Sequence, residues 1–158
     1  NILFAGRYHH SKGFERALSM VSKLNKPCNF KVFGDFPEEV ISAYSDDNIS
    51  FFGFQEDLSR IYTDSSILLI CSDYESGPLV AFEALSYGVP VLTTRVGVFQ
   101  EMHKSEEFDY LTIYDSEEEG INFLNEFISL ERFSSSKNLE FLKRYLNSVE
   151  TFYDKFLI

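Results

Sequence analysis

The sequence predicts an α/β protein built on a doubly wound, parallel sheet of about six strands with a Rossmann-like arrangement. Short apolar runs alternate along the chain with segments whose apolar residues repeat at helical spacing, and this alternation is typical of parallel sheets with helices on both faces. The run ILLIC at residues 67–71 shows no polar alternation, as expected of a central strand that is covered on both sides. The crossovers between such strands are expected to be right-handed.

Each element follows from the local pattern. Strands are expected where short apolar runs occur, at residues 2–6, 29–34, 49–53, 67–71, 89–94 and 110–115. Helices are expected between and after them, at about residues 12–24, 37–44, 56–65, 78–85, 99–103 and 117–131. A last amphipathic helix is expected at about residues 137–157, where apolar residues repeat at helical spacing.

Composition limits the possible partners. The 158 residues are expected to form a single domain, residues 1–158. The formal net charge of −11 disfavours nucleic acid and anionic membrane surfaces, because both require a basic footprint. A small phosphorylated ligand remains compatible, since it needs only a few cations placed locally. No apolar run reaches the ~18–20 residues of a membrane span, and no signal peptide is visible. Because the chain opens directly on a strand, we expect it to be a fragment of a longer protein.

The cysteines and histidines are few. Cys28 and Cys71 lie in strand-like apolar runs and are expected to be free thiols in a reducing compartment, with a single disulfide as the alternative. His9 and His10 are adjacent, but the third histidine, His103, is not at a spacing that pairs with them. We therefore expect no metal site, and the sequence favours a substrate or phosphate contact by one of the two adjacent histidines over metal binding.

Polar residues follow the ends of several predicted strands, and ligands of doubly wound sheets bind outside those ends. The first such loop, GRYHHSKGFE at residues 6–15, carries Gly6 and Gly13, which permit tight turns, and the cations Arg7 and Lys12. Ser11 is expected to cap the following helix, whose amino terminus is partly positive. Two cations beside a helix amino terminus predict a phosphate site. The alternative is that both are solvated surface charges.

A second polar segment, SDYESGPLVAFEAL, carries two carboxylates, Glu75 and Glu83, with seven residues between them. Glu83 lies in an otherwise apolar run, and burying an ionised carboxylate without partners costs several kcal/mol. We therefore expect Glu83 to face a polar cavity or a ligand, such as vicinal sugar hydroxyls. Pro78 suits a first helical turn and leaves the backbone N–H groups of Leu79 and Val80 free for an anion. The alternative is that Glu83 pairs with an arginine or caps a neighbouring helix.

These segments together resemble a known family. ESGPLVAFEA resembles the E-x7-E signature of retaining glycosyltransferases of the GT-B fold, in the large group that includes sucrose synthases, glycogen synthases and lipopolysaccharide transferases (family 4). GRYHHSKGF is similar to the G-R-x(n)-K-G loop of that group, and ALSYGVPVLTTRVGVFQE to its A-x-x-x-G-x-P-V-V-x-T stretch. The resemblance covers about residues 2–115 and only the carboxy-terminal, nucleotide-sugar-binding half of such enzymes. Val98 departs from it, because the family has a second glycine there, and this weakens the match of the loop that carries Glu101.

The resemblance implies roles for individual residues. Glu75 would contact the transferred sugar and help stabilise an oxocarbenium-like transition state, and Glu83 would bind the ribose hydroxyls. Arg7 and Lys12 would clamp the diphosphate in place of a metal ion, so that no cofactor is needed. The other implied substrate-binding residues are Gly6, Phe54, Gln55, Ser76, Gly77, Pro78, Leu79, Val80 and Gly97.

The expected function is therefore the donor half of a retaining glycosyl-transfer site, in glycan or lipopolysaccharide biosynthesis. The partner would be a nucleoside diphosphate sugar, and the acceptor (glycan, lipid or protein) is left open, as are base and sugar. The expected location is the cytoplasm, with attachment to the inner face of a membrane through the missing domain as an option. The isolated domain is expected to be inactive. The alternatives are a non-catalytic nucleotide-sugar-binding module, a phosphorylase or epimerase of the same fold, and a nicotinamide dehydrogenase half, which lacks support because no G-x-G-x-x-G follows the first strand.

Overall fold

The computed structural model describes residues 1–97, 99 and 110–129. Its strands are β1 (Ile2–Ala5), β2 (Phe30–Phe33), β3 (Ile49–Phe51), β4 (Ile67–Ile70), β5 (Val91–Thr94) and β6 (Leu111–Tyr114). Its helices are α1 (Phe14–Ser22), α2 (Glu38–Tyr44), α3 (Ser59–Thr63), α4 (Leu79–Ser86) and α6 (Glu117–Ser129), with a 3-10 turn η1 (His10–Lys12) before α1.

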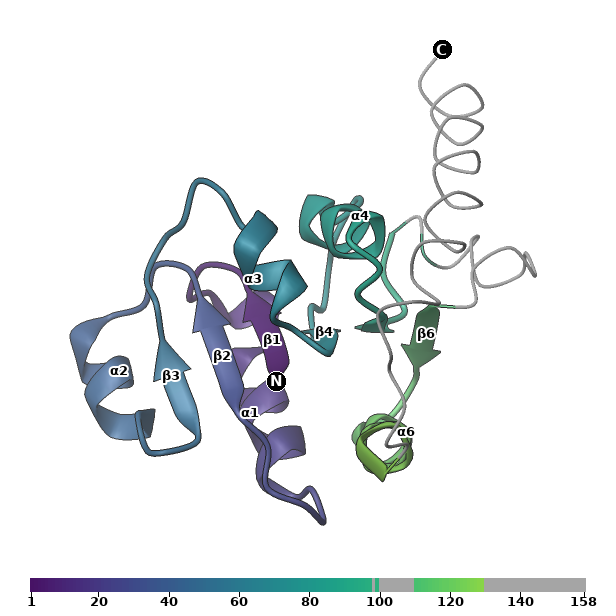
Figure 1. Cartoon of the computed structure of the whole chain (residues 1–158), viewed down its shortest axis with the longest axis horizontal. Coiled ribbons are helices and arrows are strands. Elements are labelled where there is room, and N and C mark those ends of the chain that lie inside the picture. Colours follow the sequence, from purple (N-terminus) through teal and green to yellow (C-terminus); the bar gives the residue numbers. More distant parts are fainter. Residues whose placement is uncertain (98, 100–109, 130–158) are drawn as a thin grey trace.

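The strands form one parallel sheet in the order β3-β2-β1-β4-β5-β6, as Figure 1 shows for the strands around β1. The predicted fold class, a doubly wound sheet of Rossmann-like type, is thus confirmed. In this order the chain winds outward from β1 in one direction and from β4 in the other. The boundary between β1 and β4 is the topological switch point, where such sheets bind their ligands.

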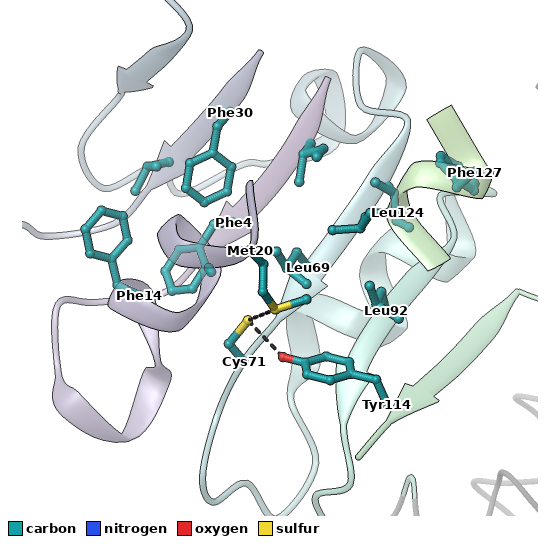
Figure 2. Packing of buried hydrophobic residues seen from close by; sticks show 14 residues of the cluster. Phe4, Phe14, Met20, Phe30, Leu69, Cys71, Leu92, Tyr114, Leu124 and Phe127 are labelled. Carbon is teal, nitrogen blue, oxygen red and sulfur yellow. Dashed lines mark hydrogen bonds between the residues drawn. The ribbon is translucent and has the colours of Figure 1, made fainter. Parts of the chain in front are cut away.

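Both faces of the sheet are covered, because alternate side chains of each strand point to opposite sides. Leu3 of β1 packs in one buried cluster with residues of α3 and α4. Its neighbours Ile2 and Phe4 pack in the second cluster, with residues of α1 and α6. Figure 2 shows part of this second cluster, and the rings of Phe4 and Phe14 meet edge to face at a centroid distance of 5.7 Å. Fully burying a phenylalanine stabilises a fold by about 1.5–3 kcal/mol, so this aromatic cluster anchors α1 firmly.

Two sulfur atoms and a phenol meet in the same cluster, as Figure 2 also shows. The hydroxyl of Tyr114 donates to Cys71 Sγ at 3.0 Å, and Cys71 Sγ lies 4.0 Å from Met20 Sδ. Cys71 is buried, Cys28 is half-buried, and both are free thiols, as the sequence predicts. Burial raises the pKa of the Cys71 thiol to about 12, so Cys71 is a protonated core residue rather than a nucleophile.

The first helix departs from the sequence prediction. It begins at Phe14, because residues His10–Lys12 form the 3-10 turn and Gly13 adopts the left-handed conformation, with φ 67°. The expectation that Ser11 caps this helix is wrong: the Ser11 hydroxyl pairs with His9 Nδ1 at 2.7 Å instead. The expected helix at 137–157 and most of that at 99–103 lie outside the described residues, as do Glu101 and His103. Within the described part of the chain, no helix is long and apolar enough to cross a membrane.

Candidate functional site

An open pocket of about 610 Å³ lies at the carboxyl edge of the sheet. The ends of both β1 and β4 contribute to its floor, through residues such as Ala5 and Ile70, so the pocket lies at the topological switch point. Its volume is in the range of small-molecule sites, roughly 300–1,000 Å³. Ten of the residues that the sequence assigns to a site line it together: Gly6, Arg7, Lys12, Phe54, Gln55, Glu75, Gly77, Pro78, Leu79 and Val80.

An ion pair between the loops that follow β1 and β4 contributes charged groups to the pocket lining. Lys12 Nζ lies 2.5 Å from Glu75 Oε1, and the hydroxyl of Ser72 donates to the same oxygen at 2.9 Å. The side chain of Glu75 is only 14% exposed and that of Lys12 28% exposed, so water screens this pair less than a surface pair. The two charges that the sequence assigns to separate groups of the ligand thus contact each other in the free protein.

Arg7 is placed differently. Arg7 lines the pocket and is exposed to solvent. It forms no ion pair with any residue that the structure describes. A guanidinium in that position is available to an incoming anion without first breaking a protein contact. Asp35, in the loop after β2, adds a negative charge to the same pocket.

The amino end of α4 closes another side of the pocket. Pro78 is the N-cap residue, and its side chain forms no capping hydrogen bond to the start of the helix. Leu79 and Val80, the first two helical residues, both line the pocket. Uncapped N–H groups at a helix start carry partial positive charge and bind anions, so the pocket has three sources of positive potential: Arg7, Lys12 and the amino terminus of α4.

Glycines bring these loops into contact. A Cβ atom on Gly13 would lie 2.1 Å from the carbonyl oxygen of Cys71, so the loop after β1 approaches the end of β4 more closely than any side chain would allow. A Cβ atom on Gly97 would lie 2.3 Å from the carbonyl oxygen of Glu75. Gly97 therefore packs closely against the Glu75 loop and does not line the pocket, although the resemblance assigns it to substrate binding. Both glycines also have positive φ, a conformation that costs other residues energy.

Arg16 of α1 is a structural residue of the site that the sequence analysis missed. Its guanidinium donates to the carbonyl oxygen of Cys71 at 2.8 Å and to Asp73 Oδ1 at 2.6 Å. In addition, the N–H of Asp73 donates to the carbonyl oxygen of Ser11 at 2.8 Å. The loop after β4 is therefore fastened to the loop after β1 at several points. No local signal indicates Arg16, because its partners lie more than fifty positions away in the sequence.

The remaining wall is apolar and aromatic. Phe54 lines the pocket with 69% of its surface exposed, and Gln55 beside it donates its side-chain amide to the carbonyl oxygen of Phe52 at 2.9 Å. Phe33 also lines the pocket and stacks on Phe52, with ring centroids 4.6 Å apart and an interplanar angle of 8°. An exposed aromatic ring in the same pocket as these cationic groups suits a flat heterocycle attached to a charged group.

Glu83 does not behave as expected. It does not line the pocket, and its residue is exposed rather than buried, so the expectation of a carboxylate in an apolar interior is wrong. The physical reason is the face of α4 on which it lies. Leu79, Glu83 and Tyr87 follow one another at intervals of four, and this stripe faces outward: Leu79 is 67% and Tyr87 42% exposed. Glu83 does have a partner, because the hydroxyl of Tyr62 donates to its Oε2 at 2.9 Å.

Ser76 is exposed and lies outside the pocket lining. The lining residues that the sequence analysis did not assign fall into two groups. Gly34, Asp35 and Ser72 follow strands at the edge that the sequence identifies as the candidate site, although it assigns them no role. The apolar members give no sequence signal beyond that of a core strand or helix: Phe4, Ala5, Phe33, Leu58, Leu69 and Ile70.

The pocket lining combines groups that can bind an anion (Arg7, Lys12 and the start of α4) with exposed aromatic and apolar side chains. It also places a carboxylate, Glu75, beside that anion. A ligand that joins a diphosphate to uncharged parts matches this set of groups.

Comparisons with known proteins bear on this geometry. Residues 1–139 match the family model of the glycosyl transferases group 1. An uncharacterised 41.2 kDa protein in the cps region of Klebsiella pneumoniae is 31% identical over 105 residues, which are 65% of this chain and 29% of that relative.

Solved structures share the fold. Sucrose-phosphate synthase from Thermosynechococcus elongatus superposes with a TM-score of 0.73 at 20% identity, over 99% of this chain and 45% of that chain. Anabaena HepE, solved in complex with UDP and glucose, gives a TM-score of 0.68 at 16% identity, over 95% of this chain and 48% of that chain. The present chain thus spans less than a third of the curated relative and about half of each of these structures.

Proposed function

Because the chain belongs to the glycosyl transferases of group 1, we propose that its pocket binds a nucleoside diphosphate sugar and forms the donor half of a retaining glycosyl-transfer site. The observation that carries this proposal is the convergence of Arg7, Lys12 and the uncapped start of α4 on one pocket at the switch point. Three sources of positive potential are more than a single phosphate requires and suit a diphosphate.

The proposed chemistry follows from these contacts. When the bond between the sugar and the diphosphate breaks, negative charge develops on the leaving group. Preorganised donors at that point stabilise the transition state, and here they would be Arg7, Lys12 and the N–H groups of Leu79 and Val80. The two cations would serve in place of a metal ion, so binding should persist in the presence of EDTA.

Glu75 would contact the transferred sugar. Its carboxylate is held beside the diphosphate position by Lys12 and Ser72, where it can accept hydrogen bonds from sugar hydroxyls and stabilise positive charge at the anomeric carbon. In this proposal Lys12 bridges the carboxylate and the leaving phosphate, so the ion pair of the free protein is retained when the donor binds. Glu83 lies outside the pocket lining, but it follows Leu79 by about one turn on the same face of α4. A ligand that extends past Leu79 would reach it, and Glu83 would bind the ribose hydroxyls with the oxygen that Tyr62 leaves free.

Uridine is the first base to test, because HepE was solved with UDP. Phe54 and Gln55 are the residues that would lie against the base. The acceptor would bind to a part of the protein outside these 158 residues, since GT-B sites lie between two domains. We therefore expect the present chain to bind a donor nucleotide weakly and to transfer no sugar by itself.

Calorimetric titration of the chain with UDP, GDP and ADP tests the proposal. One of them should bind in the micromolar to millimolar range, and Arg7→Gln should weaken it about tenfold or more, as expected for the loss of a charge-assisted hydrogen bond. Lys26→Gln is the matched control, because Lys26 is an exposed cation before β2, at the opposite edge of the sheet. Failure of all three nucleotides to bind at millimolar concentration would refute the proposal.

A radiolabelled-donor assay separates the remaining alternatives. A longer protein that contains this chain should transfer sugar with the anomeric configuration retained, which NMR of the product measures. Nucleotide binding without transfer in that longer protein would favour a non-catalytic binding module. Efficient transfer by the 158 residues alone would contradict the division into two halves.

A further inference from the structure

A buried tyrosine connects α3 to the carboxylate of α4. Tyr62 of α3 is only 1% exposed, yet its hydroxyl reaches Glu83 Oε2 at 2.9 Å. The same hydroxyl lies 3.4 Å from the carbonyl oxygen of Val80, a weaker contact one turn earlier in α4. One of the two carboxylate oxygens of the exposed residue Glu83 is therefore held by the hydroxyl of a buried tyrosine.

The Tyr62 ring has little freedom to move. It lies in the cluster that includes Leu3, Leu68 and Ala84, and it stacks on Tyr87 with ring centroids 5.5 Å apart. Burial, and then the hydrogen bond to Glu83, raises the pKa of the Tyr62 hydroxyl above its ordinary value, so it remains a proton donor throughout the physiological range. An exposed glutamate on a helix would otherwise sample several rotamers, because a long polar side chain loses up to about 1.5–2 kcal/mol of entropy when it is ordered.

We propose that Tyr62 is a positioning residue for donor binding, which holds Glu83 in one rotamer with a single oxygen presented to the ribose hydroxyls. This inference rests on the proposed function and deepens it. The hydrogen bond orders the Glu83 side chain before the ligand binds, so that binding costs less conformational entropy. Such preorganisation is a general way to gain affinity without a new ligand contact. Tyr62 itself would not touch the nucleotide.

The variant that tests this role is Tyr62→Phe, which removes the hydroxyl and keeps the ring. Tyr87→Phe is the matched control, because Tyr87 stacks on Tyr62, and its hydroxyl forms no hydrogen bond with the residues that the structure describes. The probes are UDP (or whichever nucleoside diphosphate binds the unmodified protein) and its 2′,3′-dideoxy form, both measured by calorimetry. The thermal midpoint of each variant is measured in parallel, to separate folding from binding.

We expect the unmodified protein to prefer the ribose form. Tyr62→Phe should weaken the ribose form about three- to tenfold, the size expected for one hydrogen bond, and leave the dideoxy form unchanged. Tyr87→Phe should leave both affinities unchanged. In a double-variant cycle, adding Tyr62→Phe to Glu83→Ala should cause no further loss, because Tyr62 acts through Glu83.

Other outcomes overturn the inference in distinguishable ways. If Tyr62→Phe leaves the affinity for the ribose form unchanged, the hydroxyl only satisfies its own hydrogen bond and positions nothing. If the unmodified protein binds the ribose and dideoxy forms equally, Glu83 does not contact the ribose hydroxyls. The proposed diphosphate site would be unaffected by that result. If no nucleoside diphosphate binds the unmodified protein, the proposed function and this inference fall together.

Discussion

Glu75 and Glu83 belong to one short segment, but they occupy opposite kinds of environment. Glu75 lies in a loop that is fastened to its neighbours, with a side chain only 14% exposed that contacts Lys12 and Ser72. Glu83 lies on the outward stripe of α4, where a single tyrosine hydroxyl holds it. The first carboxylate is held by two groups, one from a distant part of the chain (Lys12) and one from its own loop (Ser72), and the second by a single group.

The difference shows that a sequence spacing places two residues on an element without deciding what surrounds them. Apolar neighbours along the chain suggested that Glu83 is buried, but they pack on the other faces of α4 and leave its own face open. The Glu75 loop contains polar residues and would be expected to be open, but Gly13, Gly97 and Arg16 draw it against other loops. Each of the following changes tests one side of this comparison, and they run from the largest expected effect to the smallest.

Gly13→Ala should destabilise the protein most, because Gly13 lies against the start of the loop that carries Glu75. The new methyl group would overlap the carbonyl oxygen of Cys71 and would also require a strained φ, so we expect a loss of about 3 kcal/mol or more in unfolding free energy. Gly53→Ala is the control, because Gly53 has a similar φ of 68° but no atom within 4 Å of the added carbon. It should cost only about 1–2 kcal/mol, the strain alone. Urea denaturation measures both, and equal losses would show that the close approach is not needed.

Lys12→Gln should affect binding and stability together. It removes a cation from the proposed diphosphate site and also the partner of Glu75, so nucleotide affinity should fall about tenfold or more and unfolding free energy by about 1 kcal/mol. Arg7→Gln should lower the affinity with little change in stability, because Arg7 forms no ion pair within the described residues. Calorimetry and thermal unfolding of the two variants give the comparison. An unchanged thermal midpoint for Lys12→Gln would mean that its pair with Glu75 contributes nothing.

Neutralising each carboxylate tests the comparison directly. Glu75→Gln should cost about 1–2 kcal/mol of stability, because it weakens the contacts to Lys12 and Ser72 in a poorly hydrated position. Glu83→Gln should change stability by less than about 0.5 kcal/mol, as is usual for an exposed position. The nucleotide affinity should fall in both variants. A large loss of stability in Glu83→Gln with unaltered affinity would mark Glu83 as a structural partner of Tyr62 instead.

The smallest effect concerns Cys71, at the base of the fastened loop. Its raised pKa of about 12 means that the native thiol stays protonated at pH 8, and only the thiolate reacts with disulfide reagents. In a Cys28→Ser variant, labelling at pH 8 should therefore be slow and should accelerate as the pH rises toward 12 or when urea opens the fold. Labelling at pH 8 as fast as that of an unfolded control would show that the Glu75 loop opens readily.

The sequence by itself determined the fold class and the edge of the sheet at which the pocket lies. Apolar runs of strand length that alternate with amphipathic segments specify the parallel sheet, because each face must be covered. The edge at which the site lies follows from that, since loops that follow parallel strands meet at the same edge. Arg7, Lys12, Glu75 and the start of α4 were therefore predicted to converge, and they do line one pocket.

Only the tertiary structure decided how these groups are held. The Lys12–Glu75 pair spans 63 positions of the chain, Arg16 reaches a carbonyl 55 positions away, and Tyr62 reaches Glu83 from another helix. Such contacts depend on how loops and helices pack over the sheet, and packing leaves no periodic pattern in the local sequence. Ser11 fails to cap α1 for a local reason, because a 3-10 turn and Gly13 separate it from the helix and its hydroxyl pairs with His9, two positions away. The exposure of Glu83, by contrast, depends on which face of α4 is covered by neighbours in space, and the residues nearby in the sequence do not specify that.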